Sequence, residues 1–237
     1  MIFGAILAGG TGSRMHLADM PKQFLPLGDK PIVIHTLEKF MSCSRFDAVY
    51  LGVHPDWLEY MADLVNKYIP APTHPVHIVA GGADRNETIL HVMDAIEEAH
   101  SASPEHVIVT HDAVRPFVSL RMLEENIDTA LEYGATDTVL SATDTIVVSQ
   151  DGKVISDIPQ RSQMYQGQTP QSFRIQLLRE LYLSLSPEEK SILTDACKIC
   201  IVRNYPVHLV EGAVTNMKIT TPGDYKIAQA ILGRLDG

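Results

Sequence analysis

The amino-acid sequence predicts an α/β protein, in which one mostly parallel β-sheet is covered by helices on both faces. Two observations carry this prediction. Short β-rich runs alternate with amphipathic segments through the first half of the chain, as they do in the successive strand–helix units of parallel sheets. The 237 residues are 45% hydrophobic and show no linker, repeat or low-complexity stretch. The whole chain, 1–237, is therefore expected to form a single domain around one sizeable core.

The strand–helix units follow one another from the first residues onward. Each begins with a short aliphatic run and continues into a segment with helical spacing of its apolar side chains. Because ligands of such sheets bind at the carboxyl ends of the strands, the functional residues are expected there. The expected pairs are strand 2–8 with helix 31–41, strand 48–53 with helix 57–68, strand 76–80 with helix 86–99, and strand 106–110 with helix 120–133.

The alternation stops at 138–158, where two β-like runs flank Gln150-Asp151-Gly152-Lys153. Asp-Gly between such runs is a strong hairpin signal, so a projecting β-arm is expected at about 138–165. An isolated hairpin with apolar residues such as Ile146 would be marginal in water. We expect the arm to be buried against a second copy in a homodimer; the alternative is a hairpin folded back on its own sheet. After the arm, the sequence predicts helices near 175–185 and 188–202, a strand at 207–211, and a last helix at 222–235 that begins with proline.

Composition and charge exclude several function classes. The net charge of −10 argues against a nucleic-acid partner, because such a surface is usually basic. The apolar run 1–8 is too short for a signal peptide or a membrane span, and three cysteines do not form a disulfide framework. We therefore expect a cytoplasmic protein without a membrane partner. Cys197 and Cys200 form a C-x-x-C motif without the second pair of a four-ligand zinc site, and we expect buried helix thiols.

A glycine-rich junction follows the first predicted strand. It reads Leu7-Ala8-Gly9-Gly10-Thr11-Gly12-Ser13-Arg14-Met15, and Pro21-Lys22-Gln23 comes shortly after it. Glycines allow the backbone to approach a phosphate chain and to turn its N–H groups toward it. Arg14 and Lys22 add positive charge, which suits a triphosphate. The loop is neither a Walker loop nor a complete dinucleotide fingerprint, and by itself it could be an ordinary turn.

Asp112 comes at the carboxyl end of an apolar strand, where a carboxylate can hold Mg²⁺ between itself and nucleotide phosphates. The neighbouring His111 has no visible Asp or Ser partner, and such a histidine is more often packed or hydrogen-bonded than catalytic. These two residues belong to one of four motifs that follow the glycine-rich junction. In order, the motifs are Gly81-Gly82-Ala83-Asp84-Arg85-Asn86-Glu87-Thr88, His111-Asp112-Ala113-Val114-Arg115-Pro116, Gln168-Thr169-Pro170-Gln171 and Asn216-Met217-Lys218-Ile219-Thr220.

Together, the five motifs resemble the signature of the cytidylyltransferases that make CDP-methylerythritol and CDP-ribitol, a branch of the sugar-nucleotide transferase fold. The resemblance spans nearly the whole chain. It implies a Rossmann-like domain of the nucleotide-diphospho-sugar transferase type, with CTP and a polyol phosphate as substrates and Mg²⁺ as cofactor. It also implies a homodimer in which the arm crosses to the partner subunit.

The resemblance further implies roles for individual residues. Arg14, Lys22 and Lys218 are expected to be catalytic, and Asp112 to hold the metal. The positive charges of Arg14, Lys22, Lys218 and Arg115 would form the cationic cluster that two polyanionic substrates need in an acidic protein. The residues expected to bind the nucleotide are Leu7, Ala8, Gly9, Gly10, Thr11, Gly12, Gly81, Gly82, Ala83, Arg85, Thr88 and Asp112. Those expected to bind the acceptor are Asp112, Arg115, Thr145, Arg161 and Thr169, with Thr145 and Arg161 delivered by the partner's arm.

The expected reaction is an in-line attack of the acceptor's phosphate oxygen on the α-phosphorus of CTP, with pyrophosphate leaving. That oxygen is already ionised at neutral pH, so catalysis would consist of positioning and charge neutralisation, without a strong general base. A non-catalytic nucleotide-binding scaffold is the alternative from another class. The joint presence of Arg14, Lys22, Asp112 and Lys218 argues against it, because a binder has no need of charges that stabilise a transition state.

Two acceptors remain open. Enzymes of the methylerythritol branch typically carry an Asp before the Asn of Asn-x-Lys, and Thr215 stands there instead. The segments 85–89, 159–168 and Asp195-Ala196-Cys197-Lys198 look more like the ribitol branch. We therefore favour D-ribitol 5-phosphate, which would give CDP-ribitol as a cell-wall precursor of the teichoic-acid type. The alternative is 2-C-methyl-D-erythritol 4-phosphate of isoprenoid biosynthesis.

Overall fold

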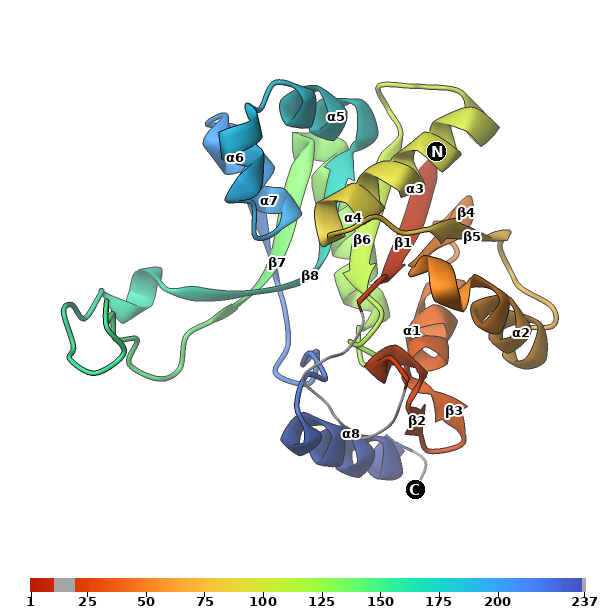
Figure 1. Ribbon diagram of the computed structural model, residues 1–237, viewed down its shortest axis with the longest axis horizontal. Helices are drawn as coiled ribbons and strands as arrows, with labels where there is room; N and C mark the ends of the chain where they lie inside the picture. The colour runs from red at the N-terminus through yellow and green to blue at the C-terminus, as the bar shows by residue number, and fades with distance from the viewer. Residues whose placement is uncertain (11–19, 236–237) are drawn as a thin grey trace.

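The computed structural model describes residues 1–10 and 20–235. Its centre is a seven-stranded sheet (Figure 1). Neighbouring strands run parallel except at β8, which is antiparallel to both of its neighbours, so the predicted mostly parallel sheet is confirmed. From edge to edge, the strands are β5 (Val76–Ala80), β4 (Ala48–Val53), β1 (Ile2–Ala8), β6 (Val107–Asp112), β8 (Tyr165–Arg174), β7 (Ala135–Ser141) and β9 (His208–Glu211).

Helices cover both faces of this sheet, as predicted. Side chains alternate along β1, because successive residues of a strand point to opposite faces. Ile6 and Ala8 pack into one apolar layer, and Phe3 and Ala5 pack into the other. The first layer is completed by α1 (Ile32–Met41), α2 (Leu58–Tyr68) and α4 (Leu120–Tyr133), and the second by α3 (Arg85–His100), α5 (Ile175–Leu183) and α7 (Ala196–Val202).

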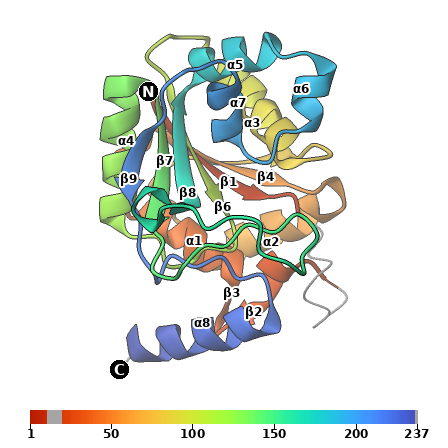
Figure 2. The same cartoon turned by 90° about the vertical axis from the view of Figure 1, so that its left-hand side faces the viewer.

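The last helix, α8 (Pro222–Leu235), lies below the sheet, apart from both layers (Figures 1 and 2). It packs against the two-stranded ribbon of β2 (Pro26–Leu27) and β3 (Lys30–Pro31). Leu27, Ile219 and Ala228 are buried in this third apolar cluster, and the Tyr225 hydroxyl donates a hydrogen bond to the carbonyl of Pro26. This packing brings the segment before α8 to the carboxyl ends of the central strands.

Two elements differ from the prediction. The strand β8 was not predicted, although it occupies a central place in the sheet. The single helix expected at 188–202 is wrong, because the chain forms α6 (Pro187–Ser191) and α7 with a break between them. Asp195 is extended there, with φ at −154°, and its carboxylate caps α7 by accepting a hydrogen bond from the Lys198 N–H at 2.9 Å. A cap of this kind fixes where a helix begins.

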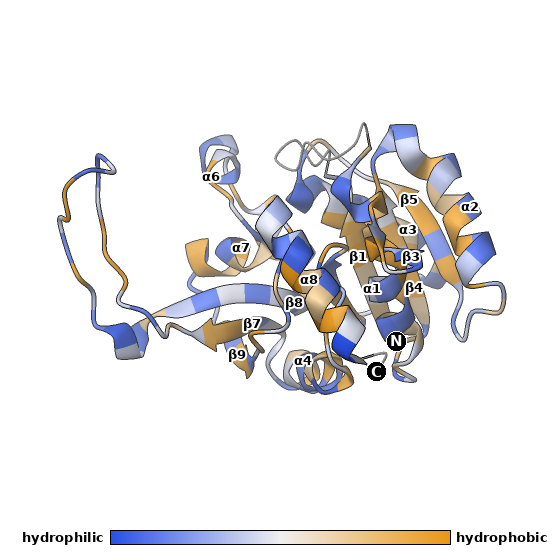
Figure 3. Ribbon diagram, turned by 90° about the horizontal axis from the view of Figure 1, so that it is seen from below, coloured by the Kyte–Doolittle hydropathy of each residue, from blue (hydrophilic) through white to orange (hydrophobic). Residues whose placement is uncertain are grey.

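The arm leaves the sheet between β7 and β8 and projects far from the body (Figure 1). It turns at the predicted place: Gly152 has φ +71°, and the Asp151 carboxylate accepts hydrogen bonds from the N–H groups of Lys153 and Val154. The expected regular hairpin is not formed. Within 142–164, the β-pairing that the structure describes is a single isolated bridge between Val148 and Asp157. Apolar stretches run along both sides of this extended arm (Figure 3).

The remaining expectations from composition concern cysteines and membranes. Cys197 and Cys200 are buried free thiols in α7, as predicted, and burial raises the pKa of Cys200 to about 12. A thiol with such a pKa is inert at neutral pH. Within the described part of the chain, no helix has both the length and the apolar character needed to span a bilayer.

Candidate active site

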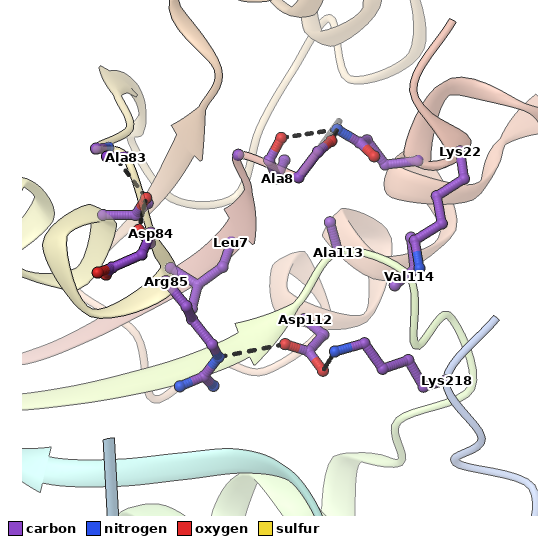
Figure 4. Close-up of a pocket in the computed structure, with 15 residues that line it drawn as sticks. Leu7, Ala8, Lys22, Ala83, Asp84, Arg85, Asp112, Ala113, Val114 and Lys218 are labelled. Atoms are coloured by element: carbon purple, nitrogen blue, oxygen red, sulfur yellow. Dashed lines mark hydrogen bonds and ion pairs between the residues drawn. The ribbon is translucent and has the colours of Figure 1, made fainter. Parts of the chain in front are cut away.

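A cavity of about 330 Å³ opens where β1 and β6 end (Figure 4). Its walls come from the turn after β1, the 3₁₀ helix η1 (Lys22–Phe24), the start of α3, the loop after β6 and the segment before α8. This is the edge of the sheet where a ligand site was predicted. The lining residues are Leu7, Ala8, Gly9, Gly10, Lys22, Gln23, Gly82, Ala83, Asp84, Arg85, Thr88, Asp112, Ala113, Val114 and Lys218.

The backbone after β1 is held in place by Gln23. This side chain is buried, and its amide donates hydrogen bonds to the carbonyl oxygens of Ala8 at 2.8 Å and Gly10 at 2.9 Å. Two carbonyls are thereby tied to η1, and the adjacent Lys22 lines the cavity. Gln23 belongs to a predicted motif, but its own role was missed, because it depends on a contact that only the folded chain makes.

The loop between β5 and α3 is closed by side chains from the first turn of α3. The Thr88 hydroxyl accepts a hydrogen bond from the Gly82 N–H at 3.1 Å and donates one to the Asp84 carbonyl at 2.8 Å. The Glu87 carboxylate accepts one from the Ala83 N–H at 2.6 Å. A Cβ at Gly82 would lie 2.6 Å from the Cβ of Glu87. Glycine is therefore required here, and it leaves bare backbone facing the cavity.

Asp112 lies at the end of β6 and is paired with three cations. Its Oδ1 lies 3.5 Å from Arg85 Nε, and its Oδ2 lies 3.2 Å from Arg115 Nε and 3.0 Å from Lys218 Nζ. Burial by itself would raise the pKa of this carboxyl, but Arg85, Lys218 and Arg115 together hold the pKa well below its usual range. Asp112 is thus ionised at neutral pH and organises positive charge at the cavity floor (Figure 4).

Behind Asp112, His111 is fully buried and hydrogen-bonded on both ring nitrogens. Its Nδ1 lies 2.9 Å from the Thr169 hydroxyl, and its Nε2 lies 3.1 Å from the Arg115 carbonyl. The same Thr169 oxygen accepts a hydrogen bond from the Asp112 N–H at 3.2 Å. Burial lowers the pKa of His111 to about 4, so the ring is neutral at pH 7. His111 is a packed, hydrogen-bonded side chain, as interpreted from the sequence.

Asn216 connects the segment before α8 to the rest of the site. The Asn216 side-chain amide donates hydrogen bonds to the Thr169 carbonyl at 2.8 Å and to Gln168 Oε1 at 3.1 Å. The backbone carbonyl of Asn216 accepts a hydrogen bond from Arg115 Nη1 at 2.8 Å. These three contacts fix the chain two residues before Lys218. They explain how a lysine near the carboxyl terminus reaches Asp112.

The site is a cation-rich cavity with bare glycine backbone on two sides. Comparison with known proteins identifies the family to which the chain belongs. The model of the family described as IspD, 2-C-methyl-D-erythritol 4-phosphate cytidylyltransferase, matches residues 2–234. The chain belongs to the IspD family. It is 50% identical to the ribitol-5-phosphate cytidylyltransferase of Streptococcus pneumoniae serotype 2 (strain D39) over 232 residues, which cover 98% of this chain and 99% of the relative. The protein is therefore a nucleotidyltransferase that uses CTP.

Solved structures of the IspD family share this architecture. The 4-diphosphocytidyl-2C-methyl-D-erythritol synthase of Anaerococcus prevotii superposes with a TM-score of 0.80 at 25% identity, covering 98% of this chain and 96% of the other. The 2-C-methyl-D-erythritol 4-phosphate cytidylyltransferase of Thermus thermophilus gives a TM-score of 0.71 at 26% identity, covering 97% of this chain and 98% of the other. The predicted nucleotide-diphospho-sugar transferase type of fold is thus confirmed by its relatives.

Most of the residues assigned from the IspD motifs lie together. Gly81 lies beside the cavity, and Arg115 and Thr169 lie behind Asp112. Thr145 and Arg161 are on the projecting arm, where Arg161 Nη1 donates a hydrogen bond to the Thr143 carbonyl at 3.1 Å. Three predicted residues, Thr11, Gly12 and Arg14, lie outside the described residues. Those that line the cavity itself are Leu7, Ala8, Gly9, Gly10, Lys22, Gly82, Ala83, Arg85, Thr88, Asp112 and Lys218.

Two aspartates line the cavity, but the Asp84 carboxylate caps α3 by accepting a hydrogen bond from the Glu87 N–H, so Asp112 is the carboxylate available to a metal ion. Among the described residues, no group of three or more His, Cys, Asp or Glu side chains is placed to hold a metal. Mg²⁺, however, is usually bound by one or two carboxylates together with substrate phosphates and water. The Asp112 carboxylate, ionised and at the cavity wall, fits a Mg²⁺ of that kind and does not fit a metal held by the protein alone.

Proposed function

We propose that this IspD family enzyme transfers the cytidylyl group of CTP to D-ribitol 5-phosphate, giving CDP-ribitol and pyrophosphate. The observation that carries the choice of acceptor is the 50% identity with a ribitol-5-phosphate cytidylyltransferase over nearly the full length of both chains. Thr215 supports the same choice, since a neutral hydroxyl stands where the methylerythritol branch usually has a carboxylate.

In the proposed reaction, a phosphate oxygen of the acceptor forms a bond to the α-phosphorus of CTP. The bond from that phosphorus to the bridging oxygen breaks, and its electron pair leaves with pyrophosphate. Lys22 and Lys218 line the cavity from separate segments and would stabilise the charge on the α-phosphate and the leaving group. Arg14 would add to this charge, as the family resemblance implies. Because the attacking oxygen is already ionised, the neutral, buried His111 has no proton to remove.

Asp112 has two proposed roles. It holds Arg85, Arg115 and Lys218 together through the ion pairs described above, and it would be the protein ligand of Mg²⁺. Bound Mg²⁺ would neutralise negative charge on the phosphates of the nucleotide. Arg115 is also proposed to hold the acceptor's phosphate, because a guanidinium fork matches phosphate geometry.

We further propose that the enzyme is a homodimer joined through the arm. Val154, Ile155 and Ile158 are each more than half exposed on it, at 67%, 56% and 57%. Such apolar side chains on an extended, weakly paired segment are typical of a surface that a second chain covers. The arm would carry Thr145 and Arg161 to the partner's acceptor pocket, which would make each site composite.

Pyrophosphate release with CTP and each acceptor, measured side by side, tests the proposed function. We expect D-ribitol 5-phosphate to give a kcat/KM at least about 10²-fold above that of methylerythritol 4-phosphate, because a site built around particular hydroxyls discriminates against an acceptor that leaves polar groups unpaired. Equal use of the two, or a preference for methylerythritol 4-phosphate, would overturn the acceptor. CTP binding without turnover on either acceptor would point instead to a nucleotide-binding scaffold.

A further inference from the structure

A second polar cluster lies beside the cavity, between β7, β8 and the start of α7. Asp137 of β7 faces Gln171 of β8 in the register of the two strands, and Gln171 Nε2 donates a hydrogen bond to Asp137 Oδ1 at 3.1 Å. Gln171 is 2% exposed, and its Oε1 has no hydrogen-bond partner among the residues that the structure describes. A buried amide oxygen without a donor is costly, by about 1–3 kcal/mol.

Arg85 connects this cluster to the cavity. Its Nε faces Asp112 Oδ1, but Nη1 and Nη2 are buried and form no hydrogen bond within the described part of the chain. Its positive charge acts on Asp137 as well as on Asp112. The charge of one guanidinium therefore acts both on the predicted phosphate-binding floor and on a carboxylate that no predicted motif includes.

Asp137 also has room in front of it. Gly167 of β8 pairs with Val139 but lies close to Asp137, because a Cβ built at Gly167 would lie 3.7 Å from Asp137 Oδ2 and would meet no other described side chain within 4 Å. Burial, with the nearby Asp195, raises the pKa of Asp137 to about 6, although Gln171 and Arg85 oppose this shift. Gln171 and the Cys197 thiol already donate to this carboxylate. Because the carboxylate is partly desolvated, additional donors would bind it favourably.

We propose that Asp137, the Oε1 of Gln171 and the outer nitrogens of Arg85 form a subsite that binds hydroxyl groups of the polyol phosphate acceptor. The inference rests on the proposed function and extends it to new residues. A hydroxyl both donates and accepts, so one hydroxyl can donate to Gln171 Oε1 and accept from Arg85, and a second can donate to Asp137. A second phosphate does not fit there, because Asp137 and Asp195 would repel it.

Asp137→Asn, which keeps the shape and removes the charge, tests the subsite through acceptor choice. Glycerol 3-phosphate serves as a truncated acceptor that lacks the distal hydroxyls of D-ribitol 5-phosphate. In the variant, we expect the ratio of kcat/KM for ribitol 5-phosphate over glycerol 3-phosphate to fall at least about tenfold, since a hydrogen bond to a charged group is replaced by a neutral one. The KM for CTP should stay as in the parent.

Two further variants separate recognition from folding. Gly167→Val fills the space before Asp137 without altering any proposed group, and it should lower the same ratio. Asp128→Asn removes a carboxylate that pairs with Arg45 on the surface, and it should leave the ratio unchanged. An unchanged ratio in folded, CTP-binding Asp137→Asn or Gly167→Val would overturn the subsite. Parent enzyme that turns over no polyol phosphate would overturn the proposed function itself, and the subsite with it.

Discussion

Lys218 Nζ lies 3.0 Å from Asp112 Oδ2, so a lysine just before the last helix closes over a carboxylate at the end of a central strand. Arg85 and Arg115 share the same carboxylate. Three cations held this close would repel one another, and the charge of Asp112 offsets that repulsion. The protein can therefore keep a preorganised positive site, and the phosphates of the substrates then add to the negative charge that Asp112 supplies.

Asp112→Asn should impair both activity and folding. Removing the charge leaves Arg115 and Arg85 without their carboxylate partner, and loss of one member of a buried ion pair costs about 3 kcal/mol or more. Urea unfolding measures this loss in the free energy of unfolding. The activity of the folded fraction should also require more Mg²⁺ than the parent does, if Asp112 is the metal ligand. A Mg²⁺ titration curve that matches the parent's would place the ligand elsewhere.

Lys22→Ala should lower turnover by roughly 10²–10³, the usual scale for the loss of one preorganised charge-stabilising group. Lys22 lines the cavity on η1, and its removal leaves the Gln23 hydrogen bonds to the backbone in place, so the fold should persist. Lys39→Ala, an exposed lysine on α1, is the matched control and should retain normal turnover. Single-turnover kinetics with saturating CTP gives the comparison. Near-normal turnover of Lys22→Ala would remove this lysine from the mechanism.

The fold was predictable where local pattern and tertiary packing agree. The helix α4 and the last helix have the predicted bounds, because the apolar spacing of each matches the cluster against which it packs, the first layer for α4 and the third cluster for α8. β8 was missed for the opposite reason. Its residues 166–171 are polar, glycine or proline, and strand pairing on both edges, rather than β-propensity, makes them a strand.

The residues of the site could be predicted where the motifs contain charged residues or glycines. Lys22, Asp112 and Lys218 do lie around one cavity. Asn216 and Gln171 were quoted within motifs, but their roles could not be predicted. Both act through hydrogen bonds to groups on strands that are distant in sequence, and such contacts exist only once the sheet order is known.

Asp137 and His111 should give the stability of the enzyme two opposite dependences on pH. The pKa of Asp137 is raised in the folded state to about 6, so folding favours its protonated form. Its contribution is lost as pH rises from about 4 to 6, by up to about 3 kcal/mol. The pKa of His111 is lowered to about 4, so its contribution is present above about 6.5 and is lost as pH falls toward 4, by a similar amount.

The Asp137→Asn variant separates these two effects. Without the titrating carboxyl of Asp137, the free energy of unfolding should rise more steeply between pH 4 and 6.5 than it does in the parent. The stability of the variant relative to the parent should therefore increase with pH. Denaturant unfolding at several pH values measures this difference, with Asp128→Asn as the control. A parent and variant whose curves stay parallel through this range would show that the Asp137 carboxyl keeps an ordinary pKa.

Mixing two inactive variants should restore activity if the arm completes the partner's site. Arg161→Ala damages the arm and Lys22→Ala damages the cavity. In a mixed dimer, the cavity of the Arg161→Ala chain receives the intact arm of the Lys22→Ala chain, so one of the two sites is undamaged. Random exchange makes about half of the dimers mixed, and the expected recovery is roughly one quarter of the parent activity. Subunit exchange is followed with differently tagged chains, and each variant alone is the control. Complete exchange without recovery would mean that each chain uses its own arm, since a site assembled within one chain carries its damage into every dimer.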